Sequence, residues 1–454
     1  MNTKKLLLCS AVLAALTAAA HAKVDDAQAA RLGQDLTPVG AEKAANADGS
    51  IPAWEGGITK PPADYKPGMH HPDPFAADQP LLTITKANVA EHKALLSPGQ
   101  LALFDAYPDS FKMVVYPTRR SASYPQAYYD ATKTNATNAV LADGGNGFTG
   151  AAIGVPFPIP ANGLEAIWNH LTRYRGVGIK RWGGQAAPTP SGDFTYIRLD
   201  EALLLRYANP GMTPEQLVKE NILFKFKQQV TQPARLAGTA LLVHETLNQV
   251  KEPRQAWTYN TGQRRVRRAP NVAYDAPGTA ADGLRTTDDY DMFNGSPDRY
   301  EWTLKGKQEL LIPYNSYKLH SNSLKNQDIL KPGHINPDLV RYEKHRVWVV
   351  EANLKPGVNH IYKKRVFFLD EDSWQVSVAD LYDNRDQMYR VAMAHGLNYY
   401  EVPTQWSTLE VFHDLQARRY IAIGLDNQEK MYEFTDSLSD DEFSPNALRQ
   451  EGRR

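Results

Sequence analysis

The most concentrated run of charge in this sequence is Arg264-Arg265-Val266-Arg267-Arg268. Side chains alternate between the two faces of a β-strand, so a strand here would place two arginines on each face. Guanidinium groups on both faces cannot all be solvated, and we expect carboxylates to pair with some of them. The nearest acidic cluster supplies the expected partners. The predicted salt-bridge cluster therefore contains Arg264, Arg265, Arg267, Arg268, Asp288, Asp289 and Asp291. The alternative is that these arginines form an anion-binding site.

A glycine-rich segment, Gly145 to Gly150, matches the dinucleotide-binding pattern, and Glu165 follows about 20 residues later. A nucleotide site of this kind needs a helix that begins at the glycines, because the helix amides bind the pyrophosphate. The sequence Pro156-Phe157-Pro158-Ile159-Pro160 follows instead. We therefore predict a surface loop.

Two histidine motifs resemble metal sites only in part. His244-Glu245-Thr246-Leu247-Asn248 begins like a zinc-protease helix, but Asn248 stands where the second histidine ligand should be, so a strand is expected. His70-His71-Pro72-Asp73 has suitable ligand atoms, but the prolines favour a solvated loop without further ligands. No nucleophile elbow or phosphate-binding loop occurs in the sequence. We predict no catalytic residue, no metal and no cofactor.

Aromatic residues at strand and helix spacing are the candidate ligand-binding residues. Residues 164–171 place apolar side chains at i, i+3, i+4 and i+7, which predicts a helix with one apolar face. Asn162 is its expected N-cap, and Gly176 is expected to end it. Ordinary core packing is the default for each aromatic pair, and a concave apolar face would make them a binding site. The candidates are Trp168, Leu171, Phe224, Phe226, Tyr300 and Trp302.

The elements that position these residues follow an N-terminal signal peptide. Lys4 and Lys5 precede an apolar run that ends in Ala20-His21-Ala22, so residues 1–22 are expected to be cleaved and the protein to be periplasmic. The only cysteine, Cys9, lies in that segment, which excludes disulfides and thiol chemistry from the mature chain. Because 51 basic residues balance 51 acidic residues, we expect no binding to nucleic acid.

The remaining chain divides into two parts. Residues 23–109 are rich in proline and are predicted to form an extended arm with short helices at 25–32 and 86–107. Residues 110–454 are predicted to form an antiparallel β domain, because successive strands have few helices between them. The expected strands are 111–116, 194–199, 222–230, 257–259, 264–268, 300–305, 309–319, 346–354, 364–370 and 374–382.

Several long segments resemble a known family. They read TPVGAE (37–42), NADGSIPAW (46–54), PFPIP (156–160), GLEAIWNH (163–170), GQRRVRRAP (262–270), PYNSY (313–317) and HRVWVVEA (345–352). Over nearly the whole mature chain, the sequence is similar to a large secreted proteobacterial family of unknown function that is described as similar to outer-membrane lipoprotein-sorting proteins.

The resemblance implies a Lol-type fold, which is a mainly β (α+β) structure. Its strongly curved antiparallel sheet forms an incomplete β-barrel, and helices plug the concave side. The resemblance also implies two partners, an outer-membrane β-barrel protein and an inner-membrane transporter of the resistance-nodulation-division type.

Three functions follow from these observations. The first is a periplasmic carrier or chaperone that binds a lipid or other hydrophobic ligand. The second is a secreted hydrolase acting on an envelope or extracellular polymer, with Asp288, Asp289 or Glu301 as acid or base. The third is a structural accessory to an outer-membrane β-barrel. An open apolar cavity inside the curved sheet would favour the carrier.

Overall fold

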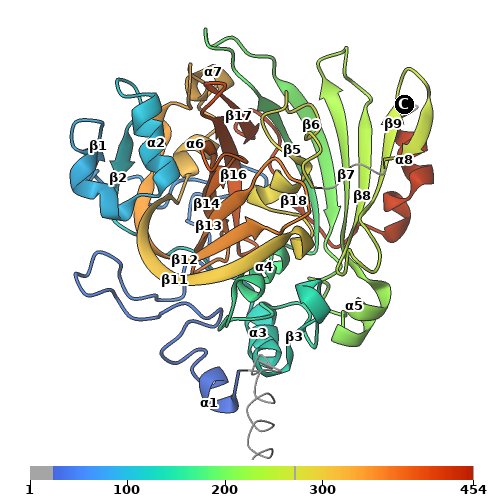
Figure 1. Ribbon diagram of the computed structural model, residues 1–454, viewed down its shortest axis with the longest axis horizontal. Helices are drawn as coiled ribbons and strands as arrows, with labels where there is room; N and C mark the ends of the chain where they lie inside the picture. The colour runs from blue at the N-terminus through green and yellow to red at the C-terminus, as the bar shows by residue number, and fades with distance from the viewer. Residues whose placement is uncertain (1–23, 270–271, 273, 453–454) are drawn as a thin grey trace, which may run out of the picture.

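The computed structural model describes residues 24–269, 272 and 274–452 (Figure 1). The predicted signal peptide, 1–22, lies outside the described residues. The strands are β1 (Leu82–Ile84), β2 (Met113–Val115), β3 (Val140–Leu141), β4 (Phe148–Thr149), β5 (Gly178–Ala186), β6 (Ile197–Leu204), β7 (Ile222–Gln232), β8 (Ala240–Thr246), β9 (Gln255–Asn260), β10 (Arg265–Arg268), β11 (Tyr300–Pro313), β12 (Tyr342–Leu354), β13 (Lys364–Asp370), β14 (Val376–Tyr382), β15 (Met388–Tyr399), β16 (Thr404–Asp414), β17 (Arg419–Gly424) and β18 (Glu433–Phe434).

The helices are short and lie between or beside the strands. The α-helices are α1 (Asp26–Ala29), α2 (Pro98–Ala106), α3 (Gln126–Asn138), α4 (Gly163–Thr172), α5 (Pro214–Glu220), α6 (Tyr317–His320), α7 (Asn326–Ile329) and α8 (Pro445–Glu451). The 3-10 helices are η1 (Val89–Leu95), η2 (Asp143–Gly145), η3 (Thr287–Met292), η4 (Pro297–Arg299), η5 (Pro337–Leu339) and η6 (Asp440–Phe443).

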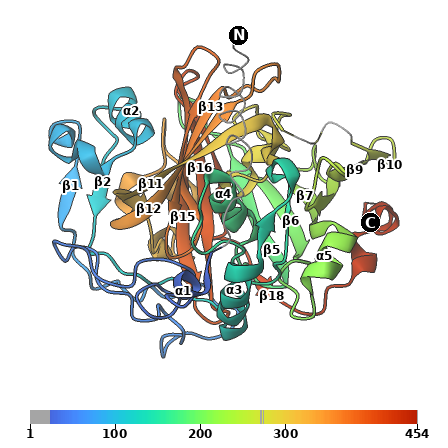
Figure 2. The same cartoon turned by 60° about the horizontal axis from the view of Figure 1, so that its bottom comes forward.

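One large sheet organises the molecule. Its order is β1-β2-β12-β13-β14-β15-β16-β17-β5-β6-β7-β8-β9-β10, with β11 on β12 and β18 on β5. Neighbouring strands are antiparallel, apart from the short parallel contact of β2 with β12. The first and last strands of this order, β1 and β10, are not paired with each other. The sheet therefore curves without closing, as the two views show, and the predicted incomplete barrel is confirmed (Figures 1 and 2).

Alternation along each strand separates an inner face of the sheet from an outer face. On β7, Phe224 and Phe226 point inward to the main core, whereas Lys225 and Lys227 point outward toward η6 and α8. On β15 the neighbours Val391 and Ala392 belong to two different cores. All residues of β16 are buried, so both faces of this central strand are covered. Antiparallel sheets often leave one face wet, but here the middle strands have none.

Helix α4 lies inside the bend and packs on β11 and β12 (Figure 2). Its N-cap is Asn162, which accepts a hydrogen bond from the Glu165 amide, as predicted. The helix ends at Thr172 and not at Gly176, so that part of the prediction is wrong. Arg173 adopts an extended conformation at the C-cap, and its guanidinium lies against Asp291.

The expected strand 309–319 is wrong in its second half. β11 ends at Pro313, and residues 317–320 form α6. Asn315 has a φ of 50°, which a strand cannot accommodate. Its side-chain amide donates to the Arg119 carbonyl at 3.0 Å and to the Glu343 carboxylate at 2.9 Å, and these bonds stabilise the turn.

A buried ion pair joins α4 to η3 inside the hollow of the sheet. Asp291 of η3 accepts hydrogen bonds from the guanidinium groups of both Arg173 and Arg175, and all three side chains are buried. Burial alone would raise the pKa of Asp291, but the two positive charges outweigh it and lower the pKa well below its usual range. His170 also contacts this segment, with Nε2 2.9 Å from the Asp291 carbonyl oxygen.

We expect Asp291→Asn to destabilise the protein strongly, because it leaves two buried guanidinium groups without a counter-charge. The free energy of unfolding, measured by urea denaturation, should fall by about 3–5 kcal/mol. The control is Asp35→Asn, which breaks an exposed pair with Arg31 and should leave the free energy of unfolding almost unchanged. A loss in Asp291→Asn no larger than in the control would show that the buried pair does not hold the filled hollow together.

Candidate functional site

The hollow of the sheet is filled in one half and retains cavities in the other. Three adjoining cavities lie on the inner face around β5, β6 and β7, beneath the segment 276–294. The outer cavity has a volume of about 610 Å³, the middle cavity about 40 Å³ and the side cavity about 50 Å³. Gln185 lines both the outer and the middle cavity, and Arg285 lines both the middle and the side cavity. Because they share lining residues, these three adjoining cavities together form the candidate site.

Strand alternation on β7 supplies a wall that runs through all three cavities. Phe224 and Phe226 line the side cavity, Gln228 lines the side and middle cavities, and Val230 lines the outer cavity. These four residues are spaced two apart, so their side chains share the inner face of the strand. The wall therefore changes from aromatic to polar to aliphatic along the strand.

The outer cavity is mainly apolar and opens where β5, β7 and β17 approach their ends. Four charged residues lie among its lining side chains, namely Asp193, Arg235, Asp282 and Arg419. Arg419 and Asp282 form an ion pair at 2.7 Å. The apolar lining consists of Ala186, Ala187, Phe194, Ile197, Val230, Leu236, Ala280 and Ile421. This combination of an apolar wall with a few polar groups is typical of sites that bind small hydrophobic molecules.

Close approach of two strands forms one wall of the middle cavity. A Cβ on Gly183 would lie only 2.3 Å from the Gly424 carbonyl oxygen, so β5 and β17 can pair this closely only with glycine at position 183. The remaining wall is charged and polar. Arg181 pairs with Glu201 and donates to the Tyr290 hydroxyl at 3.1 Å. The middle cavity is therefore polar, whereas the outer cavity is apolar.

Glu410 lines the middle cavity together with the carboxylates of Glu201 and Asp291. The Ser407 hydroxyl donates to it at 2.9 Å. Burial, with a contribution from the charge of Asp291, raises the pKa of Glu410 to about 7. A substantial fraction of this carboxyl group is therefore protonated near neutral pH, and it can donate as well as accept a hydrogen bond.

The six predicted ligand-binding residues divide between the cavities and the packed core. Phe224 and Phe226 line the side cavity. Trp168 is buried, donates to the Gly145 carbonyl at 2.9 Å and contacts Phe148 edge to face. Leu171 and Tyr300 are buried in the same core. Ligand contact by any of the six stays a prediction.

Trp302 belongs to the filled half of the hollow. Its indole N–H donates to the Pro297 carbonyl at 2.8 Å, and its ring stacks on Phe367 with 5.9 Å between centroids. Aromatic abundance alone did not distinguish this packing from a binding surface. A residue that already satisfies its polar atom and both ring faces has little surface left for a ligand.

The expected pairing of the arginine run with the aspartates is wrong. Arg264, Arg265, Arg267 and Arg268 are all exposed, and the structure gives none of them a carboxylate partner among the described residues. The physical reason is topological: β10 is the last strand of the open sheet and pairs only with β9, so both of its faces reach water.

The three aspartates bind other groups. Asp288 contacts Arg365 at 2.7 Å and His360 at 3.1 Å, whereas Asp291 pairs with Arg173 and Arg175. Asp289 accepts hydrogen bonds from the Tyr362 hydroxyl at 2.8 Å and from the Thr286 amide at 2.8 Å. These basic partners lie far away in sequence, so local patterns did not reveal them.

The histidine pair at 70 and 71 does not lie in a solvated loop, as the sequence suggested. His71 is buried, and its Nδ1 lies 3.0 Å from Nε2 of His320. Each ring also contacts a carboxylate: His320 Nδ1 lies 3.0 Å from Asp426, and His71 Nε2 lies 2.8 Å from Glu401. His70 and His71 line a cavity of about 540 Å³ beneath the N-terminal segment. A hydrogen bond between two rings requires one unprotonated nitrogen, so both rings cannot be charged at once.

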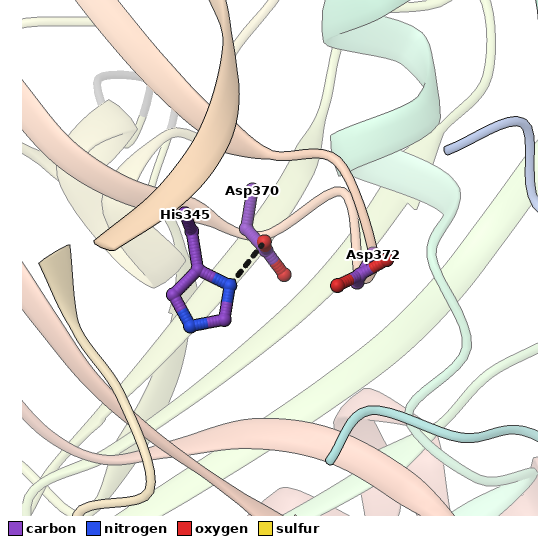
Figure 3. Close-up of side chains that lie close together, drawn as sticks. All are labelled: His345, Asp370 and Asp372. Atoms are coloured by element: carbon purple, nitrogen blue, oxygen red, sulfur yellow. Dashed lines mark ion pairs between the residues drawn. The ribbon is translucent and has the colours of Figure 1, made fainter. Parts of the chain in front are cut away.

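A second cluster of titratable groups is wholly buried (Figure 3). His345, Asp370 and Asp372 each present one potential ligand atom, and these atoms lie within 4.8 Å of one another. Both oxygens of Asp372 accept hydrogen bonds from Arg120, at 2.8 and 2.6 Å, and His345 Nε2 lies 3.1 Å from Glu343. The protein itself thus supplies counter-charges, and the arrangement fits an ion-pair cluster.

Asp370 is the member of this cluster whose charged form is least stabilised by its surroundings. Ser373 and Tyr314 donate to its Oδ2 at 2.6 and 3.2 Å, whereas Oδ1 accepts no hydrogen bond and lies 3.8 Å from His345 Nδ1. Burial and the neighbouring charge of Asp372 raise the pKa of Asp370 to about 6. Ionisation of Asp370 therefore costs the folded state free energy.

We expect acid to loosen the N-terminal segment. Burial lowers the pKa of His71 in the docked segment below the value of about 6.5 that an exposed histidine has. Below about pH 6.5 the proton therefore binds more readily to the undocked segment, and the docking of residues 60–80 weakens as the pH falls. Limited proteolysis between residues 60 and 80 should be faster at about pH 5.5 than at about pH 7.5. His71→Gln should be cut rapidly at both values, and His92→Gln should behave as wild type. Equal cutting of the wild type at both values would contradict this interpretation.

We expect Asp370→Asn to leave stability unchanged or to raise it at about pH 7.5. The folded-state pKa lies above the unfolded value of about 3.9, so the penalty exists above about pH 6 and disappears as the pH falls. Urea denaturation measures the effect. Asp372→Asn is the comparison, and it should lose about 3 kcal/mol because it strips Arg120 of its closest carboxylate. If Asp370→Asn is strongly destabilised and a chelator also destabilises the wild type, the cluster holds a cation.

Among residues 24–269, 272 and 274–452, no helix combines the length and the apolar composition that crossing a bilayer requires.

Comparison with known proteins gives relatives in sequence and in fold. An uncharacterized protein of Pseudomonas aeruginosa is 53% identical over 457 residues, covering 100% of each chain. Among solved structures, a domain from Vibrio parahaemolyticus described as an outer membrane lipoprotein-sorting protein domain is similar with a TM-score of 0.43 and 15% identity, over 63% of this chain and 98% of that domain. A DUF1329 family protein from Desulfovibrio piger gives a TM-score of 0.41 and 14% identity, over 60% and 92% of the two chains.

The family assignment rests on sequence. Residues 83–449 match the family described as protein of unknown function (DUF1329), and this span contains both the sheet and the three cavities. With most of its length matched and a full-length relative at 53% identity, this chain belongs to the DUF1329 family.

Proposed function

We propose that this chain is a periplasmic carrier or chaperone that holds a hydrophobic ligand within its curved sheet. The observation that carries the proposal is the outer cavity, which measures about 610 Å³, has eight apolar residues in its lining and adjoins the middle and side cavities. Binding sites for small molecules usually measure about 300–1,000 Å³, so this volume suits one such ligand.

The driving force would be transfer of apolar surface out of water. Each methylene group buried against the apolar lining of the outer cavity contributes about 0.8 kcal/mol. Phe224 and Phe226 extend the apolar wall into the side cavity, so the ligand would pass beneath the segment 276–294. Trp168 and Trp302 would support this wall from the packed core.

The two alternatives have less support. The hydrolase hypothesis named Asp288, Asp289 and Glu301, but both aspartates are buried in hydrogen-bond networks and Glu301 is exposed on β11. A structural accessory of an outer-membrane β-barrel needs no internal cavity. The barrel and the resistance-nodulation-division transporter remain proposed partners of a carrier, on the strength of the family resemblance.

The decisive experiment is to extract purified full-length protein with organic solvent and analyse the extract by mass spectrometry. We expect co-purified hydrophobic molecules in the wild type. Ala187→Trp should lower their amount about tenfold or more, because the indole fills the outer cavity and displaces several methylene groups. Ala77→Trp, at an exposed position, is the matched control and should retain them. An empty wild type that also fails to bind added hydrophobic ligands would contradict the carrier function, and co-purification of a membrane barrel instead would favour the accessory.

A further inference from the structure

Arg285 is a buried cation without a matching anion. Its side chain is nine-tenths or more buried, and its one hydrogen bond is a long contact of 3.4 Å from Nη1 to the Thr286 carbonyl oxygen. The Nε atom is buried and has no hydrogen-bond partner. Taking a guanidinium group out of water without compensation is costly, so a folded protein rarely leaves one in this state.

The other buried arginines show how unusual this is. Within the described part of the chain, every other arginine as deeply buried as Arg285 has a carboxylate within ion-pair distance. These arginines are Arg120, Arg173, Arg175, Arg341, Arg346, Arg365 and Arg390. The protein thus supplies a carboxylate wherever it buries a guanidinium group for structure, and Arg285 is the exception.

The exception lies at the centre of the candidate site. Arg285 lines both the middle and the side cavity. Its side chain lies over Gly278, where a Cβ would be 3.1 Å from the guanidinium carbon Cζ. The amide oxygens Oε1 of Gln185 and Gln228, which line the middle cavity, also lack hydrogen-bond partners. The unpartnered donor of Arg285 indicates a place for an acceptor from outside the chain, whereas the two amide oxygens are acceptors and would bind a water molecule beside it.

The carboxylates that face the middle cavity leave the charge of Arg285 unmatched. Three carboxylates line this cavity, namely Glu201, Asp291 and Glu410. Glu201 forms its ion pair with Arg181 and also accepts a hydrogen bond from Gln228, and Asp291 pairs with Arg173 and Arg175. Glu410 accepts a hydrogen bond from Ser407 and makes no ion pair within 4 Å with any described arginine or lysine. The middle cavity, at about 40 Å³, exceeds the roughly 10–15 Å³ that one water requires, so it suits a small polar group.

We propose that the ligand is an amphiphile with an anionic head group, which binds Arg285 in the middle cavity while its apolar chain lies in the adjoining cavities. This inference rests on the proposed carrier function and specifies its ligand class. A planar guanidinium group recognises carboxylates and phosphates by charge-assisted, often paired hydrogen bonds, and either head group would satisfy it. The apolar lining of the outer cavity would bind the chain, and Arg285 would select the head.

The test compares ligands that share one alkyl chain and differ in the head. The delipidated full-length protein is titrated with dodecanoate, dodecyl phosphate, dodecanol and dodecyltrimethylammonium, with binding measured by calorimetry. We expect the two anions to bind about tenfold or more tightly than the alcohol, and the cation to bind most weakly. The carboxylate and phosphate arms show which anion is preferred.

Two variants address Arg285 itself. Arg285→Gln should remove the preference for the anions and leave dodecanol binding unchanged. Gly278→Ala keeps the charge but crowds the guanidinium group, so it should weaken anion binding without weakening dodecanol binding. The control is Arg267→Gln on the exposed strand β10, which should change neither. Circular dichroism of each variant establishes that it is folded.

The outcomes separate this inference from the proposed function. If wild type binds none of the four compounds, the carrier function fails, and the anionic ligand class fails with it. If wild type binds dodecanol and dodecanoate equally, the carrier function stands and the role of Arg285 is overturned. That comparison needs no variant, so it remains decisive even if Arg285→Gln does not fold.

Discussion

A curved sheet with a hollow must fill or cover its inner face, and in this protein charged groups do part of the filling. Helix α4 and η3 occupy one half of the hollow, and the buried contacts of Arg173 and Arg175 with Asp291 join them. Removing one member of such a cluster leaves uncompensated charge in a region of low dielectric constant, at a cost of about 3–5 kcal/mol. The interior is therefore fixed by matched charges as well as by apolar packing.

This matching of charges explains why the two halves of the hollow differ. In the filled half, Trp302 and Phe367 stack, and the buried Asp288 pairs with Arg365. In the half formed by β5, β6 and β7, the enclosing segment does not fill the space, and Arg285 lacks a partner. A buried guanidinium group without an ion-pair partner beside a cavity is typical of a binding site, whereas a purely structural interior would be expected to pair it.

The sequence was sufficient for much of the fold and for little of the site. Strands with one wet face, such as β7 and the first half of β11, alternate visibly and were predicted, as was the cap of α4. Strands β15 and β16 were missed because they are covered on both faces, and a strand without a wet face loses the two-residue alternation. Phe224 and Phe226 were found through strand spacing, but nothing local distinguishes Arg285, whose importance lies in an absent partner. The contact of His71 with His320 likewise joins residues far apart in sequence.

The same charges limit how a ligand could enter. Displacing α4 would break buried ion pairs, so exchange through the filled half is energetically unfavourable. The strand ends around the outer cavity offer a less costly route. There, residues 277–286 are held by the bridge between Pro277 and Thr286 and by the amide of Gln185, which donates to the carbonyls of Thr279 and Ala280 at 2.8 and 2.7 Å. Arg390 also donates to the Gly283 carbonyl at 2.6 Å, and Arg419 forms a partly exposed ion pair with Asp282. The contacts of Gln185 are neutral hydrogen bonds, each worth about 1 kcal/mol, and the ion pair of Asp282 is partly exposed and therefore weak. A small movement of this segment would widen the way from the outer cavity to Arg285 while the buried ion pairs of α4 stay in place.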